Sequence, residues 1–240
     1  MLINDVILAK FGKLEYLELL KDGHLYFSPI KVLRDDGTLY RGDINEGKVP
    51  IDPQKFYING KSLINDYKLP PPDSLMLSYN NDDNRFIFCS AMINNTILEY
   101  SSSENSHILC QAFKDNISQF GEHVIIFWSS ELIKRLNTVL DNSIKKFGYL
   151  FNPISYVDFT DFLGYNYFIE AQKKHSNFYA RYFIKDISYK IQNEWRLLIN
   201  GLDCHLEANC GEGFLVDIGK FEIAQIYETS TFLDGLRWNE

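Results

Sequence analysis

The segment IKDISYKIQNEWRLLIN, residues 184–200, contains two alternations that run in opposite phase. Successive side chains on a β-strand point to opposite faces, so a strand over residues 189–199 would separate the two sets. One face would carry mostly apolar side chains, namely Ile191, Asn193, Trp195, Leu197 and Ile199. The other would carry mostly polar side chains, namely Lys190, Gln192, Glu194, Arg196 and Leu198. We expect the apolar face to be buried and the polar face to line a cleft.

A simpler interpretation of the same pattern stays open. Any half-solvated strand alternates apolar and polar residues. Glu194 and Arg196 would then form an exposed ion pair, which contributes about 0–1 kcal/mol to stability. The two interpretations differ in whether the polar row meets open water or a ligand.

Length and composition are typical of a globular protein. The chain has 240 residues, of which 45% are hydrophobic and 15% aromatic, and we predict a single domain over residues 1–240. The net charge of −8 argues against broad, non-specific phosphate binding, which needs many lysines and arginines. A local basic cleft is still compatible with this balance.

Cysteine usage predicts a cytoplasmic protein with reduced thiols and no metal. No CxxC pair occurs, and Cys89 lies in the apolar run FIFCSAM as an expected buried thiol. Cys204, His205 and Cys210 match no zinc-ligand spacing, and the acidic loop at residues 33–53 does not follow the ligand order of a calcium loop. The N-terminus lacks the features of a signal peptide, and no apolar run approaches the ~18 residues of a membrane span.

The remaining patterns predict an α+β fold with a mostly antiparallel sheet. Helices are expected at residues 14–20 and 108–119 and from Ser129 or Ser130 onward. Strands are expected at residues 24–28, 85–93, 123–128, 149–158, 213–218 and 222–228. Residues 94–107 are expected to form a loop. The charged loop at 33–53 is either solvated or mobile beside a ligand site.

Several common catalytic motifs are absent from the sequence. There is no Gly-rich phosphate loop, no GxSxG elbow and no HExxH helix. ATP chemistry, lipase-type hydrolysis and zinc proteolysis are therefore disfavoured.

Five segments occur in an order that resembles a bacterial family associated with abortive infection and phage defence. They are GHLYFSP (23–29), RGDINEG (41–47), FIFCSAM (86–92), FGEHVIIFWSSELIKRL (120–136) and FIKDISYKIQNEWRLLI (183–199). The likeness spans most of residues 11–200. That family is in turn similar to divergent ADP-ribosyltransferases, including toxins of toxin–antitoxin–chaperone systems. The resemblance implies an ADP-ribosyltransferase-like split antiparallel β-core with flanking helices, NAD⁺ as the substrate and no metal.

The resemblance also implies site residues. The family signature is a His or Arg on the first core strand, a Ser or Tyr on a middle strand and a Gln-x-Glu on a late strand. His24, Ser90, Gln192 and Glu194 stand in that order. The sequence departs from the family where Ser90-Ala91-Met92 replaces the usual Ser-Thr-Ser.

Each implied residue has a role. Glu194 would stabilise the oxocarbenium-like ribose formed as nicotinamide leaves, and Gln192 would orient the acceptor. Ser90 would hydrogen-bond Glu194 and hold its rotamer. His24 would bind the adenosine ribose, and Tyr26 would stack on nicotinamide or on the other ring of the cofactor. The alternatives are a hydrogen-bonded surface histidine and an ordinary core tyrosine.

The pyrophosphate of NAD⁺ would pair with an arginine, because a forked guanidinium matches phosphate geometry. Arg34, Arg41 and Arg196 are the candidates. The alternative for Arg196 is that it only pairs with Glu194.

Two classes of function follow. The first is an NAD-dependent mono-ADP-ribosyltransferase toxin that acts in phage defence, with nucleic acid (mRNA bases) favoured over protein as the acceptor. It implies an antitoxin partner covering the cleft, accompanied in the similar systems by a chaperone, and no membrane association. The second is a non-catalytic module that binds a nucleotide or a partner in a defence complex. A nuclease with clustered acids holding a metal is a third, weaker option.

Overall fold

The protein is described by a computed structural model that covers residues 5–36, 42–51, 57–62, 65–66, 75–77, 85–143, 149–159, 178–200 and 213–238. Its architecture is organised around the strand β7 (Arg85–Ile93), which carries the dense apolar run RFIFCSAMI and is buried along nearly its whole length. A strand that is apolar on both faces must be covered on both faces. The remaining elements provide that cover.

The main sheet has eight strands and is antiparallel throughout. Its order is β11-β14-β7-β1-β10-β16, with β2 also paired to β7 and β15 paired to β2. Besides β7, these strands are β1 (Ile7–Gly12), β2 (His24–Pro29), β10 (His123–Trp128), β11 (Tyr149–Pro153), β14 (Glu194–Asn200), β15 (Phe214–Asp217) and β16 (Gln225–Glu228). The predicted α+β class with a mostly antiparallel sheet is confirmed.

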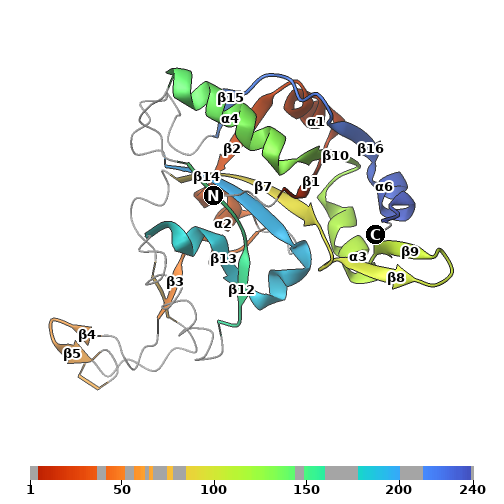
Figure 1. The fold of residues 1–240 in the computed structure, drawn as a ribbon. Helices are drawn as coiled ribbons and strands as arrows, with labels where there is room; N and C mark the ends of the chain where they lie inside the picture. Colours follow the sequence, from red (N-terminus) through yellow and green to blue (C-terminus); the bar gives the residue numbers. More distant parts are fainter. Residues whose placement is uncertain are drawn as a thin grey trace.

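One face of the sheet packs against α1 (Leu14–Lys21) and α4 (Ser129–Ser143), as Figure 1 shows. Both helices bury leucines three or four residues apart, namely Leu17, Leu20, Leu132 and Leu136. Trp195, Leu197 and Ile199 of β14 reach the same core. The apolar row predicted along residues 189–199 is therefore buried from Trp195 onward.

The turn between α1 and β2 depends on a glycine. Gly23 has a φ of 102°, and an added Cβ would lie 2.4 Å from the backbone of Gly219. Only glycine combines this conformation with so close an approach. The turn sets where β2 enters the sheet.

Two separate apolar clusters lie on the opposite face. At one end, α3 (Gln111–Ile117), η3 (Ser118–Phe120) and α6 (Thr229–Gly235) cover β1 and the end of β7. At the other end, α2 (Ile30–Asp35) and η4 (Phe178–Phe183) cover Ile87 and Leu198. The region between the two clusters holds the candidate site.

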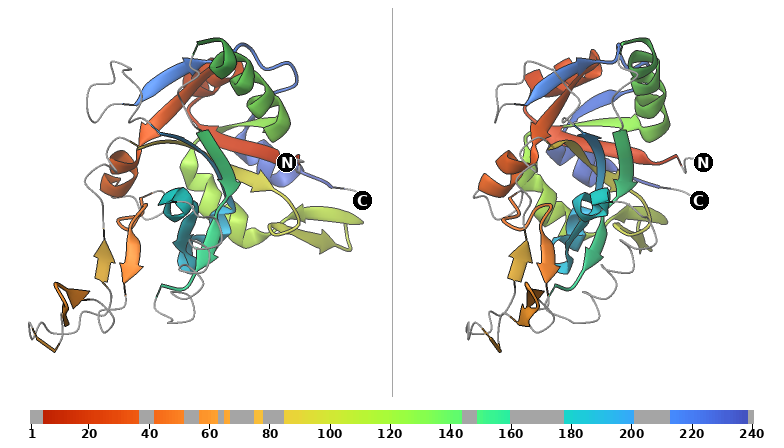
Figure 2. Two further views of the ribbon diagram at one scale, coloured as in Figure 1. Left: turned by 60° about the vertical axis from the view of Figure 1, so that its left-hand side comes forward. Right: turned by 90° about the vertical axis from the view of Figure 1, so that its left-hand side faces the viewer.

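Short elements complete the described chain. The hairpin β8 (Leu98–Ser101) and β9 (Ser106–Leu109) is antiparallel, whereas β12 (Ser155–Val157) and β13 (Ile184–Asp186) pair in parallel. The pairs β3 (Val49–Ile51) with β6 (Leu75–Leu77) and β4 (Tyr57–Ile58) with β5 (Lys61–Ser62) extend away from the main sheet (Figure 2). A 3₁₀ helix, η5 (Ile187–Gln192), leads into β14.

The structure confirms most predicted elements and corrects several, among them the strand expected at 149–158, which is interrupted at Ile154 and forms β11 and β12. The expected strand at 189–199 begins only at Glu194, because η5 occupies the preceding residues. Residues 94–107 form most of the β8–β9 hairpin rather than a loop, so the helix expected at 108–119 starts at Gln111. The N-terminal strand β1, whose alternation was not predicted, lies beside β7.

Candidate active site

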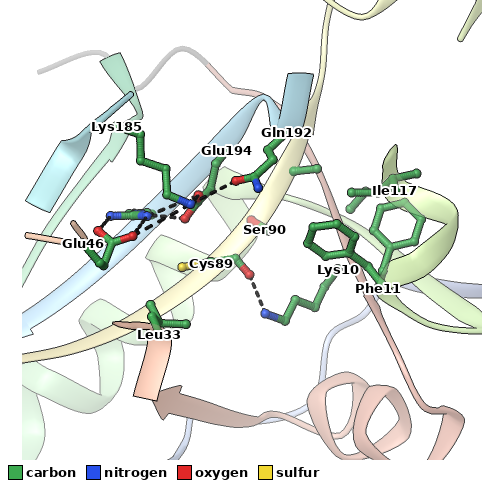
Figure 3. A pocket seen from close by; sticks show the side chains of 14 residues that line it. Lys10, Phe11, Leu33, Glu46, Cys89, Ser90, Ile117, Lys185, Gln192 and Glu194 are labelled. Carbon is green, nitrogen blue, oxygen red and sulfur yellow. Dashed lines mark hydrogen bonds and ion pairs between the residues drawn. The ribbon is translucent and has the colours of Figure 1, made fainter. Parts of the chain in front are cut away.

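A cavity of about 160 Å³ opens on the second face of the sheet, between the two apolar clusters. Strands β1, β7 and β14 form its floor. Figure 3 shows Phe11 and Ile117 on one side of the cavity and a group of charged side chains on the other. The lining residues are Ala9, Lys10, Phe11, Leu33, Glu46, Cys89, Ser90, Ala91, Ile117, Phe120, Lys185, Gln192, Glu194 and Arg196.

The cavity lies where the sheet splits. Along one edge of β7, β1 pairs only with residues 91–93 and β2 pairs only with residues 86–87. Among the described strands, residues 88–90 of β7 thus have no partner on that edge. Lys10 of β1 reaches into this gap and donates from Nζ to the carbonyl of Cys89 at 2.7 Å. A side chain therefore replaces a missing strand contact beside the cavity.

The charged wall is a buried network of two acids and two bases. Arg196 donates from Nε to Glu194 at 2.5 Å and binds Glu46 through both terminal nitrogens, at 2.5 and 2.7 Å. Lys185 donates from Nζ to Glu194 Oε2 at 2.9 Å and lies 3.8 Å from Glu46. The exposed fractions are 1% for Glu46 and Arg196, 3% for Lys185 and 7% for Glu194. The surface ion pair considered from sequence is therefore ruled out, and the polar face of β14 is buried.

These contacts determine the charge of Glu194. Burial alone would raise its pKa, but Arg196 and then Lys185 outweigh burial and lower it. Burial likewise favours neutral forms of Lys185 and Arg196, yet Glu194 and Glu46 raise the pKa of both. All three side chains are therefore ionised at neutral pH.

Asn193 brings Gln192 and Glu194 to the same cavity. It has a φ of 45°, in the left-handed region that asparagine tolerates better than most residues, and it caps η5. Its side-chain amide donates to the Met92 carbonyl at 2.7 Å and to Asn94 at 2.9 Å. Both Gln192 and Glu194 line the cavity, although they do not share one strand as predicted.

The main chain of Glu194 is held on its other side by β12. The Glu194 N–H donates to the hydroxyl of Tyr156 at 2.8 Å. Burial, followed by the charge of Glu194, raises the pKa of Tyr156, so its hydroxyl stays neutral. The carboxylate is thereby fixed through both its side chain and its backbone.

The expected hydrogen bond from Ser90 to Glu194 is absent. On β7 it is Cys89, not Ser90, that faces Glu194. Ser90 lines the cavity but pairs across the sheet with Trp195, whose ring lies in the first core. Its hydroxyl oxygen is buried and has no hydrogen-bond partner among the described residues. Cys89 instead pairs across the sheet with Arg196 and lines the cavity near Glu194. Burial and then the charge of Glu194 raise the pKa of Cys89 to about 12, so the half-buried thiol remains neutral.

The two residues predicted on the first core strand lie elsewhere. His24 and Tyr26 are on β2, opposite Asp217 and Leu215 of β15, and neither is among the described residues that line the cavity. The Tyr26 side chain is 53% exposed, which excludes an ordinary core position. At the cavity, β7 pairs with β1. Strand β2 pairs only with the opposite end of β7.

The three arginines have different environments. Arg196 is saturated by Glu46 and Glu194. Arg34, on α2, donates from Nε to the main-chain carbonyl of Glu46 at 2.6 Å and so supports the loop that carries Glu46. Arg41 lies outside the described residues.

Glu46, Lys185 and Lys10 were missed from sequence. Glu46 lies in the charged loop that was expected to be solvated or mobile, yet Asp43 and Glu46 are buried and Gly47 packs on the ring of Tyr182. Lys185 lies in the segment 184–200, but the strand predicted in that segment began after it, at residue 189. Lys10 is a lone lysine in an apolar N-terminal run, which was a usable sign of a functional position.

No group of three or more His, Cys, Asp or Glu residues within the described part of the chain is arranged to hold a metal ion. Cys204, His205 and Cys210 lie outside the described residues. None of the described helices is both long and apolar enough to cross a bilayer.

The arrangement combines a carboxylate that is ionised at neutral pH, an amide and an apolar wall around a small hollow. A carboxylate held in this way can stabilise a developing positive charge at a ligand carbon, because it is already oriented and partly shielded from water. Comparisons of the chain with protein-family models, with curated proteins and with solved structures found no match.

Proposed function

We propose that the protein is an NAD-dependent mono-ADP-ribosyltransferase with an ADP-ribosyltransferase-like split β-core. The observation that carries the proposal is Glu194, an ionised carboxylate at the floor of a cavity where β1 and β2 separate along β7. The order of segments that resembles the phage-defence family supports it. So does Gln192, which reaches the same cavity as Glu194.

The reaction uses the positive charge of the nicotinamide ring. The bond from ribose C1′ to nicotinamide breaks, and its electron pair leaves with nicotinamide, which becomes neutral. The oxocarbenium-like ribose is stabilised by the Glu194 carboxylate. A lone pair of the acceptor then forms the new bond to C1′, and the acceptor loses one proton to solvent. NAD⁺ and acceptor thereby give ADP-ribosylated acceptor, nicotinamide and a proton.

The site residues take revised roles in this proposal. Glu194 and Gln192 keep theirs, whereas Ser90 makes no hydrogen bond to Glu194 and Cys89 is the β7 residue whose charge state is coupled to that carboxylate. Arg196 orients Glu194 instead of binding the pyrophosphate, because two carboxylates already occupy its guanidinium. The cavity volume of about 160 Å³ is below the ~300–1,000 Å³ of sites for drug-sized ligands, so only one ring of the dinucleotide fits within it.

The wider biological role is proposed from the family resemblance. The protein would act in the cytoplasm as a phage-defence toxin, and nucleic acid would accept ADP-ribose. Because the net charge is −8, any contact with RNA would have to be confined to a local region of the surface. An antitoxin that covers the cavity would restrain the enzyme, and purification from the native operon should recover it as a bound partner.

The test is transfer of label from adenylate-labelled NAD⁺ to cellular RNA or protein, with nicotinamide release measured in parallel. Glu194→Gln should lower transfer by about 10²–10³-fold, as does loss of a group that stabilises charge in the transition state. Glu104→Gln is the matched control, since Glu104 pairs with Arg237 on the surface. Equal transfer by wild type and Glu194→Gln, or none by either, would contradict the proposal.

A non-catalytic module is favoured by one observation. Both oxygens of Glu194 are engaged by Arg196 and Lys185, as in a purely structural ion network. Such a module would bind NAD⁺ or another nucleotide without turnover. Calorimetry distinguishes the two functions, because heat of binding without nicotinamide release supports the module.

A further inference from the structure

We infer that the outer edge of strand β8 docks an extended, basic segment of a partner protein, which adds to the β8–β9 hairpin as a further strand. The residues of this hairpin are not among those that line the cavity, so the inference is independent of the proposed transferase function. Figure 1 shows the hairpin projecting beyond α3, on the side of the molecule where the C-terminal segment lies.

The register of the hairpin shows which edge is available. His107 exchanges both of its backbone hydrogen bonds with Trp238, at 2.9 Å each. Hydrogen-bonded and non-hydrogen-bonded pairs alternate along an antiparallel ladder, so Tyr100 and His107 form a non-hydrogen-bonded pair. The N–H and C=O of Tyr100 therefore point away from β9, and those of Leu98, two residues earlier, do the same. Among the described residues, no strand pairs with this outer edge of β8.

Three aromatic side chains form a row that ends at this edge. Residues directly opposite each other in antiparallel strands share a face, so Tyr100, His107 and Trp238 lie side by side. Tyr100 is the outermost of the three, and its side chain is 59% exposed. Its ring lies 5.5 Å from that of His107, and its hydroxyl donates to Asn105 Oδ1 at 2.8 Å. An incoming strand would therefore place a side chain against an aromatic ring that is exposed and already held in position.

The charge of the hairpin selects the occupant. Residues 94–109 contain two glutamates and neither lysine nor arginine. Glu99 lies on the edge strand and is exposed, and the Glu104 side chain is 47% exposed where it pairs with Arg237. Natural edge strands are commonly protected by lysine or proline, and β8 has neither.

A basic strand complements this edge in two ways. A lysine or arginine on one face would pair with Glu99, and one on the other face would lie over the ring of Tyr100 as a cation–π contact. Nucleic acid, or the same edge of a second copy, would bring further negative charge instead. Main-chain hydrogen bonds to Leu98 and Tyr100 would supply the rest of the interaction, as in other cases of strand addition.

The experiment uses a short fluorescein-labelled peptide of alternating valine and arginine, titrated at low salt with the full chain and followed by fluorescence anisotropy. Two control peptides carry glutamate in place of arginine, or an N-methyl group on every backbone amide, which blocks strand pairing. Wild type should bind the first peptide and neither control. Backbone hydrogen exchange of Leu98 and Tyr100 should slow in the complex, because their N–H groups become hydrogen-bonded.

Three variants locate the binding. Glu99→Lys places a cation on the edge and should weaken binding of the basic peptide by at least about tenfold. Glu18→Lys makes the same charge change at an exposed position of α1 and should weaken it by less than about twofold. Tyr100→Ala should weaken it by roughly two- to fivefold, the scale of one exposed cation–π contact. Circular dichroism verifies that each variant is folded.

Failure of wild type to bind the basic peptide overturns the inference. Equal binding of the N-methylated peptide, or equal losses in Glu99→Lys and Glu18→Lys, also overturns it, because attraction would then come from overall charge alone. If Glu99→Lys does not fold, hydrogen exchange of Leu98 and Tyr100 in wild type decides the question. Protection of these two amides by an oligoribonucleotide, or by self-association without peptide, would assign the edge to nucleic acid or to a second copy and would overturn the proposed occupant.

Discussion

Two clusters among the described residues place an arginine between two glutamates, one fully buried and one partly exposed. In the buried cluster Arg196 contacts Glu46 and Glu194 at 2.5–2.7 Å. In the partly exposed cluster Arg135 of α4 contacts Glu131 at 3.0 Å and Glu222 at 3.3 Å, and the Glu222 side chain is 84% exposed. The chemistry is the same, and the degree of burial separates their effects. The Arg196 cluster holds both of its carboxylates away from water, whereas the Arg135 cluster exposes one of its two.

The two clusters are also expected to contribute differently to the free energy of unfolding. Charges removed from water interact strongly, but each depends on its partners to offset desolvation. Exposed pairs are screened by water and salt, so each contributes little. Three measurements test this contrast.

The largest effect is expected from removing the central arginine. Arg196→Met should lower the free energy of unfolding by about 3–5 kcal/mol, because among the described residues it leaves Lys185 as the remaining cationic partner of the buried Glu46 and Glu194. Arg135→Met should lower it by less, because one of its two carboxylate partners, Glu222, is 84% exposed. Denaturant unfolding of both variants measures the two values. Similar losses in the two would show that burial does not distinguish the clusters.

An intermediate effect on stability is expected when the pH is lowered and Glu194 is protonated. Arg196, Lys185 and the Cys89 thiol face Glu194 and lower its pKa in the folded protein, against the opposing effect of burial. A lowered folded pKa contributes stability above the unfolded value of about 4.3, and this contribution is lost as pH falls below it. The stability advantage of wild type over Glu194→Gln should therefore shrink by about 1–3 kcal/mol between about pH 5 and pH 2.

Glu222→Gln is the control for this titration, because it removes one carboxylate at the surface. Unfolding should be followed by circular dichroism at each pH. An advantage of wild type over Glu194→Gln that stays constant down to pH 2 would mean that Glu194 is not held as a buried, paired carboxylate.

The smallest effect is expected from salt. Glu222→Gln should change the unfolding free energy by less than about 0.5 kcal/mol in low salt, and the change should vanish near 1 M NaCl, where the screening length is about 3 Å. Glu46→Gln should stay destabilising at both salt concentrations, since its carboxylate is 1% exposed. Salt sensitivity of the same size in both variants would contradict the distinction.

Local patterns predicted the strands better than they predicted the site. The run at 85–93 predicted β7 with its observed bounds, and the alternation from Trp195 to Ile199 predicted which face of β14 joins the first apolar core. The same alternation wrongly predicted a strand before Glu194, because polar residues can have the same spacing in an irregular turn as in a strand. Asn193 adopts a left-handed conformation, and the resulting kink brings the polar side chains on either side of it to the same cavity, as a continuous strand was expected to do.

The site residues were predicted in part. Glu194, Gln192 and Arg196 line one cavity, which is what their spacing indicated. His24 and Tyr26 were placed on the first strand because β1 was not anticipated, and Ser90 was chosen over its neighbour Cys89 by family order alone. A shift of one position on a strand reverses the face of a side chain, and only the pairing of β7 with β14 decides it.

The sequence by itself determined the α+β class, the central apolar strand and the face of β14 that joins the apolar core, because each follows from the order of apolar and polar residues along a few neighbouring positions. Only the tertiary structure decided the partners of Glu194. Glu46 reaches Arg196 from 150 residues away, and Lys185 reaches Glu194 around the turn formed by η5. Which charges meet in a folded chain depends on how distant segments pack, and that information is not contained in the local pattern of any one of them.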